Sequence, residues 1–209
     1  MADAARYPVP ASRHRAEQSI ERSRFICTVQ RAATPEDAQA FIRELNAEFA
    51  DATHNCWAYI AGPPGSTSRI GMSDDGEPHG TAGRPMLTVL THSGVGEVVA
   101  VVTRYYGGTK LGTGGLVKAY GGAVQLALES LPRAERVDYV EVMLSIAYAS
   151  IDTVQQLLPA HEAEVVAQEY GVGVTYRLRV PRQNLASLRA AVADATRGEG
   201  LMSALNAEE

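Results

Sequence analysis

The segment from Val98 to Tyr106 constrains the fold most strongly, because apolar and β-branched residues dominate it. Such a run is typical of a central β-strand that is covered on both faces. It leads directly into the glycine-rich stretch Gly107–Gly115, and apolar residues then recur at helical spacing from Leu116 to Leu131. The order of strand, glycine-rich loop and helix predicts a fold that mixes helices and sheets, and Pro132 is expected to end the helix.

Shorter patterns complete this first block. Thr34 followed by Pro35 and two acidic residues is typical of a helix start, and a regular apolar spacing follows it. The residues before position 19 show no clear pattern, so residues 1–18 are predicted to be a mobile leader. The other predicted elements are a strand over 23–29, a strand over 55–61 that forms a hairpin with 68–73, and a short helix opened by Pro85.

Beyond Pro132 the pattern restarts. Residues 132–136 read as a short polar linker, and the elements that follow are expected in the order β-α-β-β-α-β. This order is that of a split-βαβ, ferredoxin-like domain. The sequence therefore predicts an α+β protein with a first domain over residues 19–132 and a second over residues 137–209.

The charge is unevenly distributed between these blocks. Of the 19 Lys+Arg and 24 Asp+Glu residues, 14 and 14 fall in residues 1–136, which leaves 5 and 10 for residues 137–209. The second block is therefore acidic. Within the first block, residues 98–128 contain Arg104, Lys110 and Lys118 and no acidic residue. A local cationic surface of this kind attracts phosphates even when the whole chain is negative.

The glycine-rich stretch allows two interpretations. A loop that opens a helix leaves free backbone N–H groups at the positive end of the helix dipole, where an anion is stabilised. Alternatively, the glycines permit left-handed turns and close packing. The stretch is not a Walker A loop, because no Gly-Lys-Ser/Thr closes it, and it lacks the third glycine of a dinucleotide fingerprint.

A second glycine-containing stretch, SDDGEPHGTAGRP, spans Ser73–Pro85. Asp74, Asp75 and Glu77 could act in acid/base chemistry, and Asp74 and Asp75 with His79 could bind a divalent cation. The spacing is not that of an EF-hand, and turn chemistry accounts for most of these residues. A turn held by side-chain hydrogen bonds is therefore the favoured interpretation, and no metal is predicted.

Cys27 and Cys56 have no CxxC spacing, so neither a disulfide framework nor a zinc site is indicated. His54 and Cys56 would share one face of a strand and could form a nucleophilic pair, although a small buried cysteine is the more common situation. The chain has no signal-peptide pattern and no apolar run long enough to span a bilayer. These features predict a cytoplasmic protein with reduced thiols and no membrane partner.

Three stretches resemble the signature of the YigZ/IMPACT family: HNCWAY, SDDGEPHGTAGRPML and VVTRYYGGTKLGTGGLVKAYGGA. The resemblance as a whole extends over most of residues 20–131. His79 and Thr109 stand where the family more often has serine and isoleucine. The resemblance implies a first domain similar to domain 2 of ribosomal protein S5 and a second similar to the last domain of elongation factor G. Both likenesses point to the ribosome or structured RNA.

The leading hypothesis is therefore a translation-associated binding protein, not an enzyme, that contacts the ribosome or structured RNA, with a translation-related protein as a further partner and no DNA. The alternative is a phosphate- or metal-dependent enzyme, because small-molecule kinases of the GHMP group share the S5-like fold. That enzyme would use Mg²⁺ at the acidic stretch. The predicted phosphate contacts are Arg84, Arg104, Lys110, Thr113, Gly114, Gly115 and Lys118.

Overall fold

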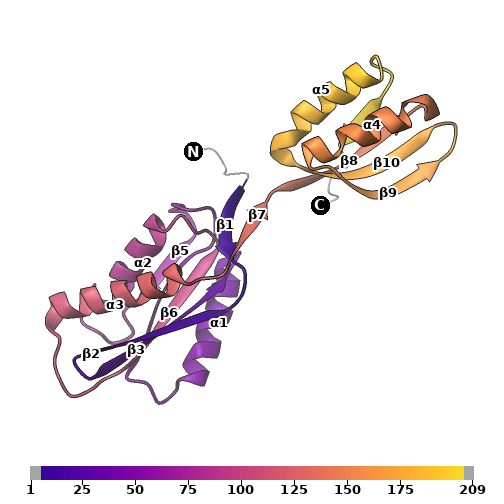
Figure 1. The fold of residues 1–209 in the computed structure, drawn as a ribbon. Coiled ribbons are helices and arrows are strands. Elements are labelled where there is room, and N and C mark those ends of the chain that lie inside the picture. Colours follow the sequence, from indigo (N-terminus) through magenta and orange to yellow (C-terminus); the bar gives the residue numbers. More distant parts are fainter. Residues whose placement is uncertain (1–5, 205–209) are drawn as a thin grey trace. The chain divides into compact units, whose positions relative to one another are not determined.

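Strand β6 (Val98–Tyr105) is the middle strand of a five-stranded antiparallel sheet with the order β2-β3-β6-β4-β5 (Figure 1). The computed structural model describes residues 6–204. Every residue of β6 except the last is buried, as the apolar sequence predicts. The other strands of this sheet are β2 (His14–Ile20), β3 (Ser23–Arg31), β4 (His54–Ile60) and β5 (Ile70–Ser73).

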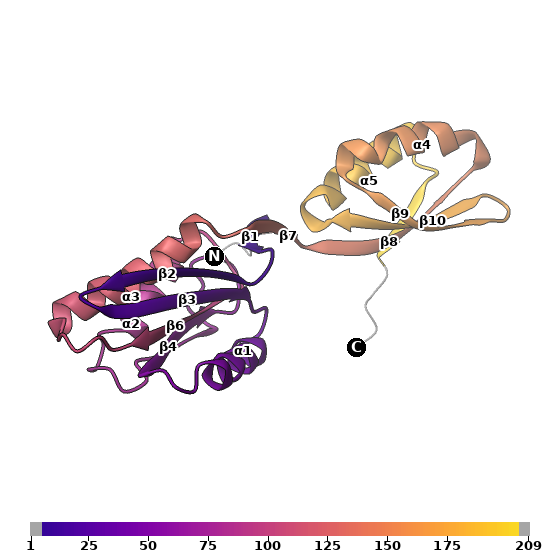
Figure 2. The same cartoon turned by 60° about the horizontal axis from the view of Figure 1, so that its bottom comes forward.

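Helices cover both faces of this sheet (Figure 2). On one face α1 (Pro35–Glu48) packs on Val99 and Val101 of β6. On the other face α2 (Gly83–His92) and α3 (Gly112–Glu129) pack on the β6 residues that alternate with these two valines. Successive side chains of a strand point to opposite faces, so β6 contributes to both cores. No helix in the described part of the chain is long and apolar enough to cross a lipid bilayer.

The prediction of a mobile leader over residues 1–18 is wrong for residues 6–18. Strand β1 (Arg6–Pro10) pairs with β7 (Arg133–Val137), and β2 pairs with β3. Polar residues dominate β2 because it is an edge strand with one face partly open, which hides the strand pattern. The prediction of a polar linker over residues 132–136 is also wrong, because most of these residues belong to β7. Residues 1–5 lie outside the described range.

The chain divides into two compact units, residues 1–136 and residues 137–209. In the second unit the strand order β11-β8-β10-β9, with antiparallel pairs, confirms the ferredoxin-like prediction. Its helices lie on one face of that sheet (Figure 2). The elements are β8 (Tyr139–Ile146), α4 (Ile151–Leu157), β9 (Glu164–Tyr170), β10 (Val174–Pro181), α5 (Leu185–Ala195) and β11 (Leu201–Ala204).

Candidate functional site

A cavity of about 440 Å³ lies in the first unit where the start of β4, the end of β6 and the start of α3 meet. Both glycine-containing stretches contribute to its walls, so they form one site although more than 20 residues separate them in the sequence. The charged and polar residues that line it include Glu77, Arg104, Lys110 and Thr113. Of the three predicted acidic residues, only Glu77 lines this cavity.

A buried ion pair forms the polar centre of the cavity wall. Arg104 donates to Glu77 Oε1 at 2.5 Å, and the hydroxyl of Tyr120 donates to the same oxygen at 2.7 Å. Arg104 and Glu77 are 5% and 8% exposed, and Tyr120 is fully buried. Burial raises the pKa of Tyr120 above its usual range, so its hydroxyl remains a donor. The positive charge of Arg104 thus largely compensates the negative charge of the Glu77 carboxylate.

Arg104 also has an unused donor. Among the described residues, no acceptor bonds its buried Nε–H, while a second guanidinium nitrogen donates to Ser23 Oγ at 3.3 Å. The guanidinium carbon lies 5.4 Å from the ring centroids of Phe25 and Tyr106. Arg104 was predicted as a surface phosphate contact, but the structure places it inside the wall, fixed by these partners.

Asp74 caps the start of α2. Its Oδ1 accepts from the N–H groups of Ala82 and Gly83 at 3.0 and 2.8 Å, and its Oδ2 accepts from Gly80 N–H at 2.7 Å. Partial burial acts to raise the pKa of Asp74, but the three backbone donors outweigh it and the pKa falls below its ordinary value. The carboxylate therefore serves the fold of the loop.

We expect Asp74→Ala to lower the free energy of unfolding by about 2 kcal/mol at pH 7, because three N–H groups lose a charged acceptor. Since the folded-state pKa is lowered, this contribution is complete above the ordinary value of 3.8 and is lost as the pH falls through the folded-state value. Urea unfolding between pH 7 and 3 measures it. Glu129→Ala, at an exposed carboxylate, is the control; equal losses in both variants would contradict the assignment.

Asp75 joins the same loop to β4. Its Oδ2 accepts from Asn55 N–H at 2.6 Å, and its carbonyl oxygen accepts from His54 Nδ1 at 2.7 Å, which requires that nitrogen to carry the proton. His79 is fully exposed, 3.9 Å from Asp74 Oδ2. Within residues 6–204 no group of three His, Cys, Asp or Glu side chains is arranged to hold a metal ion. Asp74, Asp75 and His79 thus do not converge on one point.

The start of α3 differs from the prediction. The helix begins at Gly112, so Thr113, Gly114 and Gly115 form its first turn. No side chain in the described residues caps this turn, and it contains no acidic residue, so its N–H groups are available to an anion. Lys110 lines the cavity and is exposed. Lys118 is exposed further along α3 and Arg84 is exposed on α2; neither lines the cavity.

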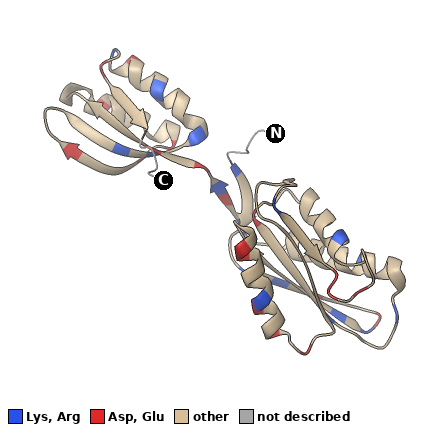
Figure 3. Ribbon diagram, turned by 180° about the vertical axis from the view of Figure 1, so that it is seen from behind, with Lys and Arg blue, Asp and Glu red and all other residues tan. Residues whose placement is uncertain are grey.

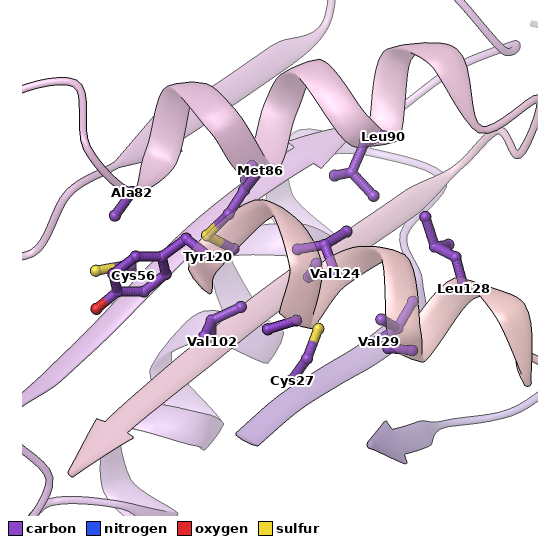
Figure 4. Packing of buried hydrophobic residues seen from close by; sticks show 14 of the residues in the cluster. Cys27, Val29, Cys56, Ala82, Met86, Leu90, Val102, Tyr120, Val124 and Leu128 are labelled. Atoms are coloured by element: carbon purple, nitrogen blue, oxygen red, sulfur yellow. The ribbon is translucent and has the colours of Figure 1, made fainter. Parts of the chain in front are cut away.

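The two cysteines lie in the core. Cys56 Sγ donates to the Asp74 carbonyl oxygen at 2.9 Å, and both thiols lie among apolar side chains such as Met86 and Val102 (Figure 4). Burial raises the pKa of Cys27 and of Cys56 to about 12. A thiol that stays protonated at neutral pH is not a nucleophile, so the geometry argues against a catalytic pair of His54 and Cys56.

Several wall residues have no signal in the sequence. Pro78, Leu111 and Leu116 line the cavity but resemble ordinary turn and core residues. Tyr106 and Tyr120 look equivalent in the sequence, yet Tyr120 is buried in the core whereas Tyr106 is 45% exposed at the cavity. Its position directly before two glycines, where a strand ends, is the one hint that Tyr106 leaves the core.

The chain resembles known proteins over both units. Residues 21–128 match the model of the Impact N-terminal domain, and residues 144–199 match a domain of unknown function (DUF1949). "IMPACT family member YigZ" of Escherichia coli (strain K12) is 42% identical over 190 residues, which cover 91% of this chain and 93% of the relative. An "IMPACT family member" of Haemophilus influenzae is 38% identical over 205 residues, covering 98% and 100%. A solved structure described as "Crystal structure of an hypothetical protein" superposes with a TM-score of 0.66 at 40% identity, covering 98% and 99%.

Proposed function

The chain belongs to the IMPACT family, and we propose that it acts in the cytoplasm as a translation-associated binding protein whose first unit holds phosphates of ribosomal or other structured RNA. One observation carries this proposal: the uncapped start of α3 opens onto a cavity whose wall also bears the exposed Lys110. Backbone N–H groups at a helix start and basic side chains are the usual phosphate ligands.

The charge distribution favours an extended polyanion over a single phosphate. Residues 98–128 contain three basic residues and no acidic one, and Lys118 lies outside the cavity on α3. In contrast, α1 on the other sheet face carries four acidic residues and only one basic residue, Arg43 (Figure 3). Lys110 and Lys118 would therefore meet successive phosphates of one strand. The acidic second unit would contact a ribosomal or other translation-related protein, or limit RNA affinity.

The alternative of an Mg²⁺-dependent enzyme receives less support. Such an enzyme needs free carboxylate oxygens beside the phosphate site. Both oxygens of Asp74 and one of Asp75 accept from backbone N–H groups, and Glu77 is paired with Arg104. The acidic side chains of this stretch thus have structural partners.

We expect Lys110→Glu/Lys118→Glu to weaken ribosome binding by at least about tenfold and to lower the slope of log K against log salt by roughly 1.4 to 1.8, because two phosphate contacts are lost. Co-sedimentation with ribosomes and separated subunits over a salt series measures both quantities. The control is Arg43→Glu/Arg189→Glu, which changes the net charge equally at exposed sites on α1 and α5. If both double variants lose affinity equally, or neither does, these lysines are not the contact surface.

A further inference from the structure

We infer that the cavity accepts one unpaired nucleotide of the bound RNA, with its base inside against Tyr106 and its phosphate at the start of α3. This inference rests on the proposed function and assigns a ligand to its site. The inferred ligand is a planar base joined to a phosphate. This inference therefore goes beyond the proposed contact with the phosphates of the RNA backbone.

The size of the cavity is the first argument. Its volume of about 440 Å³ falls in the range of small-molecule sites, about 300 to 1,000 Å³. A single phosphate at the start of α3 would leave most of this space unfilled. The site therefore has room for a larger group attached to that phosphate.

The apolar part of the wall indicates what that group is. Pro78, Leu111 and Leu116 line the cavity together with the exposed ring of Tyr106. The Arg104 guanidinium lies 5.4 Å from the centroid of that ring, and Thr53 Oγ1 accepts from Tyr106 N–H at 3.0 Å, so the residue is held at the cavity. An aromatic ring held at an apolar site is a platform on which any base can stack.

The unused donor of Arg104 is the third argument. Its side chain is only 6% exposed and lines the cavity, yet its Nε–H has no acceptor within the described residues. A buried donor without a partner is unfavourable, but protein atoms cover this Nε. A shift of the Arg104 side chain must therefore bring the N–H to an acceptor of the ligand, which relieves that cost. Base carbonyl oxygens and ring nitrogens are such acceptors. Lys110 and the N–H groups of the first turn of α3 remain for the phosphate.

A test compares a short 5′-labelled oligouridylate with an abasic strand carrying the same phosphates, by fluorescence anisotropy at fixed salt concentration. We expect the base-containing strand to bind at least about fivefold more tightly, the contribution of one stacked base. Tyr106→Ala should remove this preference, and Tyr106→Phe should keep it because the ring remains. Tyr170→Ala, which removes an exposed tyrosine of the second unit, is the control.

The outcomes separate the two proposals. Equal binding of both strands, or a preference that survives in Tyr106→Ala, overturns the base-binding cavity and leaves the phosphate contact standing. Failure of both strands to bind overturns the proposed RNA contact as well. Uridine 5′-monophosphate that binds as tightly as the oligonucleotide would overturn RNA as the source of the nucleotide, and inorganic phosphate serves as the reference for the anion alone.

Discussion

Replacing Arg104 with methionine is expected to lower the free energy of unfolding of the first unit by about 3 to 5 kcal/mol. The substitution leaves the Glu77 carboxylate buried with Tyr120 as its remaining close donor. Removing one partner of a buried pair costs more than the pair itself contributes, because the remaining charge has lost its solvation. The protein has one tryptophan, Trp57 on β4, so urea unfolding followed by its fluorescence reports on this unit.

Two comparisons make this result specific. Arg104→Met/Glu77→Gln should recover most of the loss, since no charge is left buried. Arg43→Met on the exposed face of α1 should change stability by less than about 0.5 kcal/mol. A loss below about 1 kcal/mol for Arg104→Met would show that the pair does not hold the site together. The double variant also offers a folded protein in which RNA binding can be tested without the buried pair.

Gly107→Ala is expected to destabilise the first unit by about 3 kcal/mol or more. A Cβ atom at Gly107 would lie 2.0 Å from the carbonyl oxygen of Arg22 and 2.1 Å from its carbonyl carbon. Both are backbone atoms of the turn between β2 and β3, where Glu21 and Arg22 already have positive φ, so the turn cannot move aside cheaply. The change should appear as a lower urea midpoint.

Gly114→Ala is the matched comparison. Within residues 6–204, no atom outside its chain neighbours and the adjacent helix backbone lies within 4 Å of its added Cβ. The position is in α3, where alanine is favoured over glycine by up to about 1 kcal/mol. Stability should therefore rise or stay unchanged. If RNA phosphates approach Gly114 closely, this variant loses RNA affinity while remaining stable. Equal stability losses in Gly107→Ala and Gly114→Ala would contradict this distinction, in which Gly107 is needed for packing and Gly114 for contact with RNA.

The sequence predicted elements whose signals are local. Thr34 and Asp37 form the helix start expected at α1, with reciprocal side-chain to backbone bonds of 3.0 and 3.1 Å. The order of elements in the second unit follows from alternating strand and helix patterns. In contrast, β1 and β2 were missed because an edge strand does not need a continuous apolar pattern.

The site depends on contacts that no local pattern encodes. Glu77 and Arg104 meet because the loop after β5 folds against the end of β6, 27 residues further along the chain. Arg104 therefore looked like a surface cation, and Glu77 looked like one of three equivalent acids. Asp74 and Asp75 do follow turn chemistry, as the sequence favours. The cavity itself arises from the pairing of β4 with β6, in which His54 lies opposite Arg104.

The position of β6 in the middle of the sheet also sets the order in which the first unit can form during synthesis. Strand β3 pairs with β6, with Arg24 opposite Tyr105, so 74 residues (105 − 31) must be made after the end of β3 before its inner edge is fully covered. At roughly 5 to 20 residues per second this takes about 4 to 15 s on the ribosome. Until then the inner edge of the β2–β3 hairpin is unpaired, and an unpaired apolar strand edge is prone to associate with other chains.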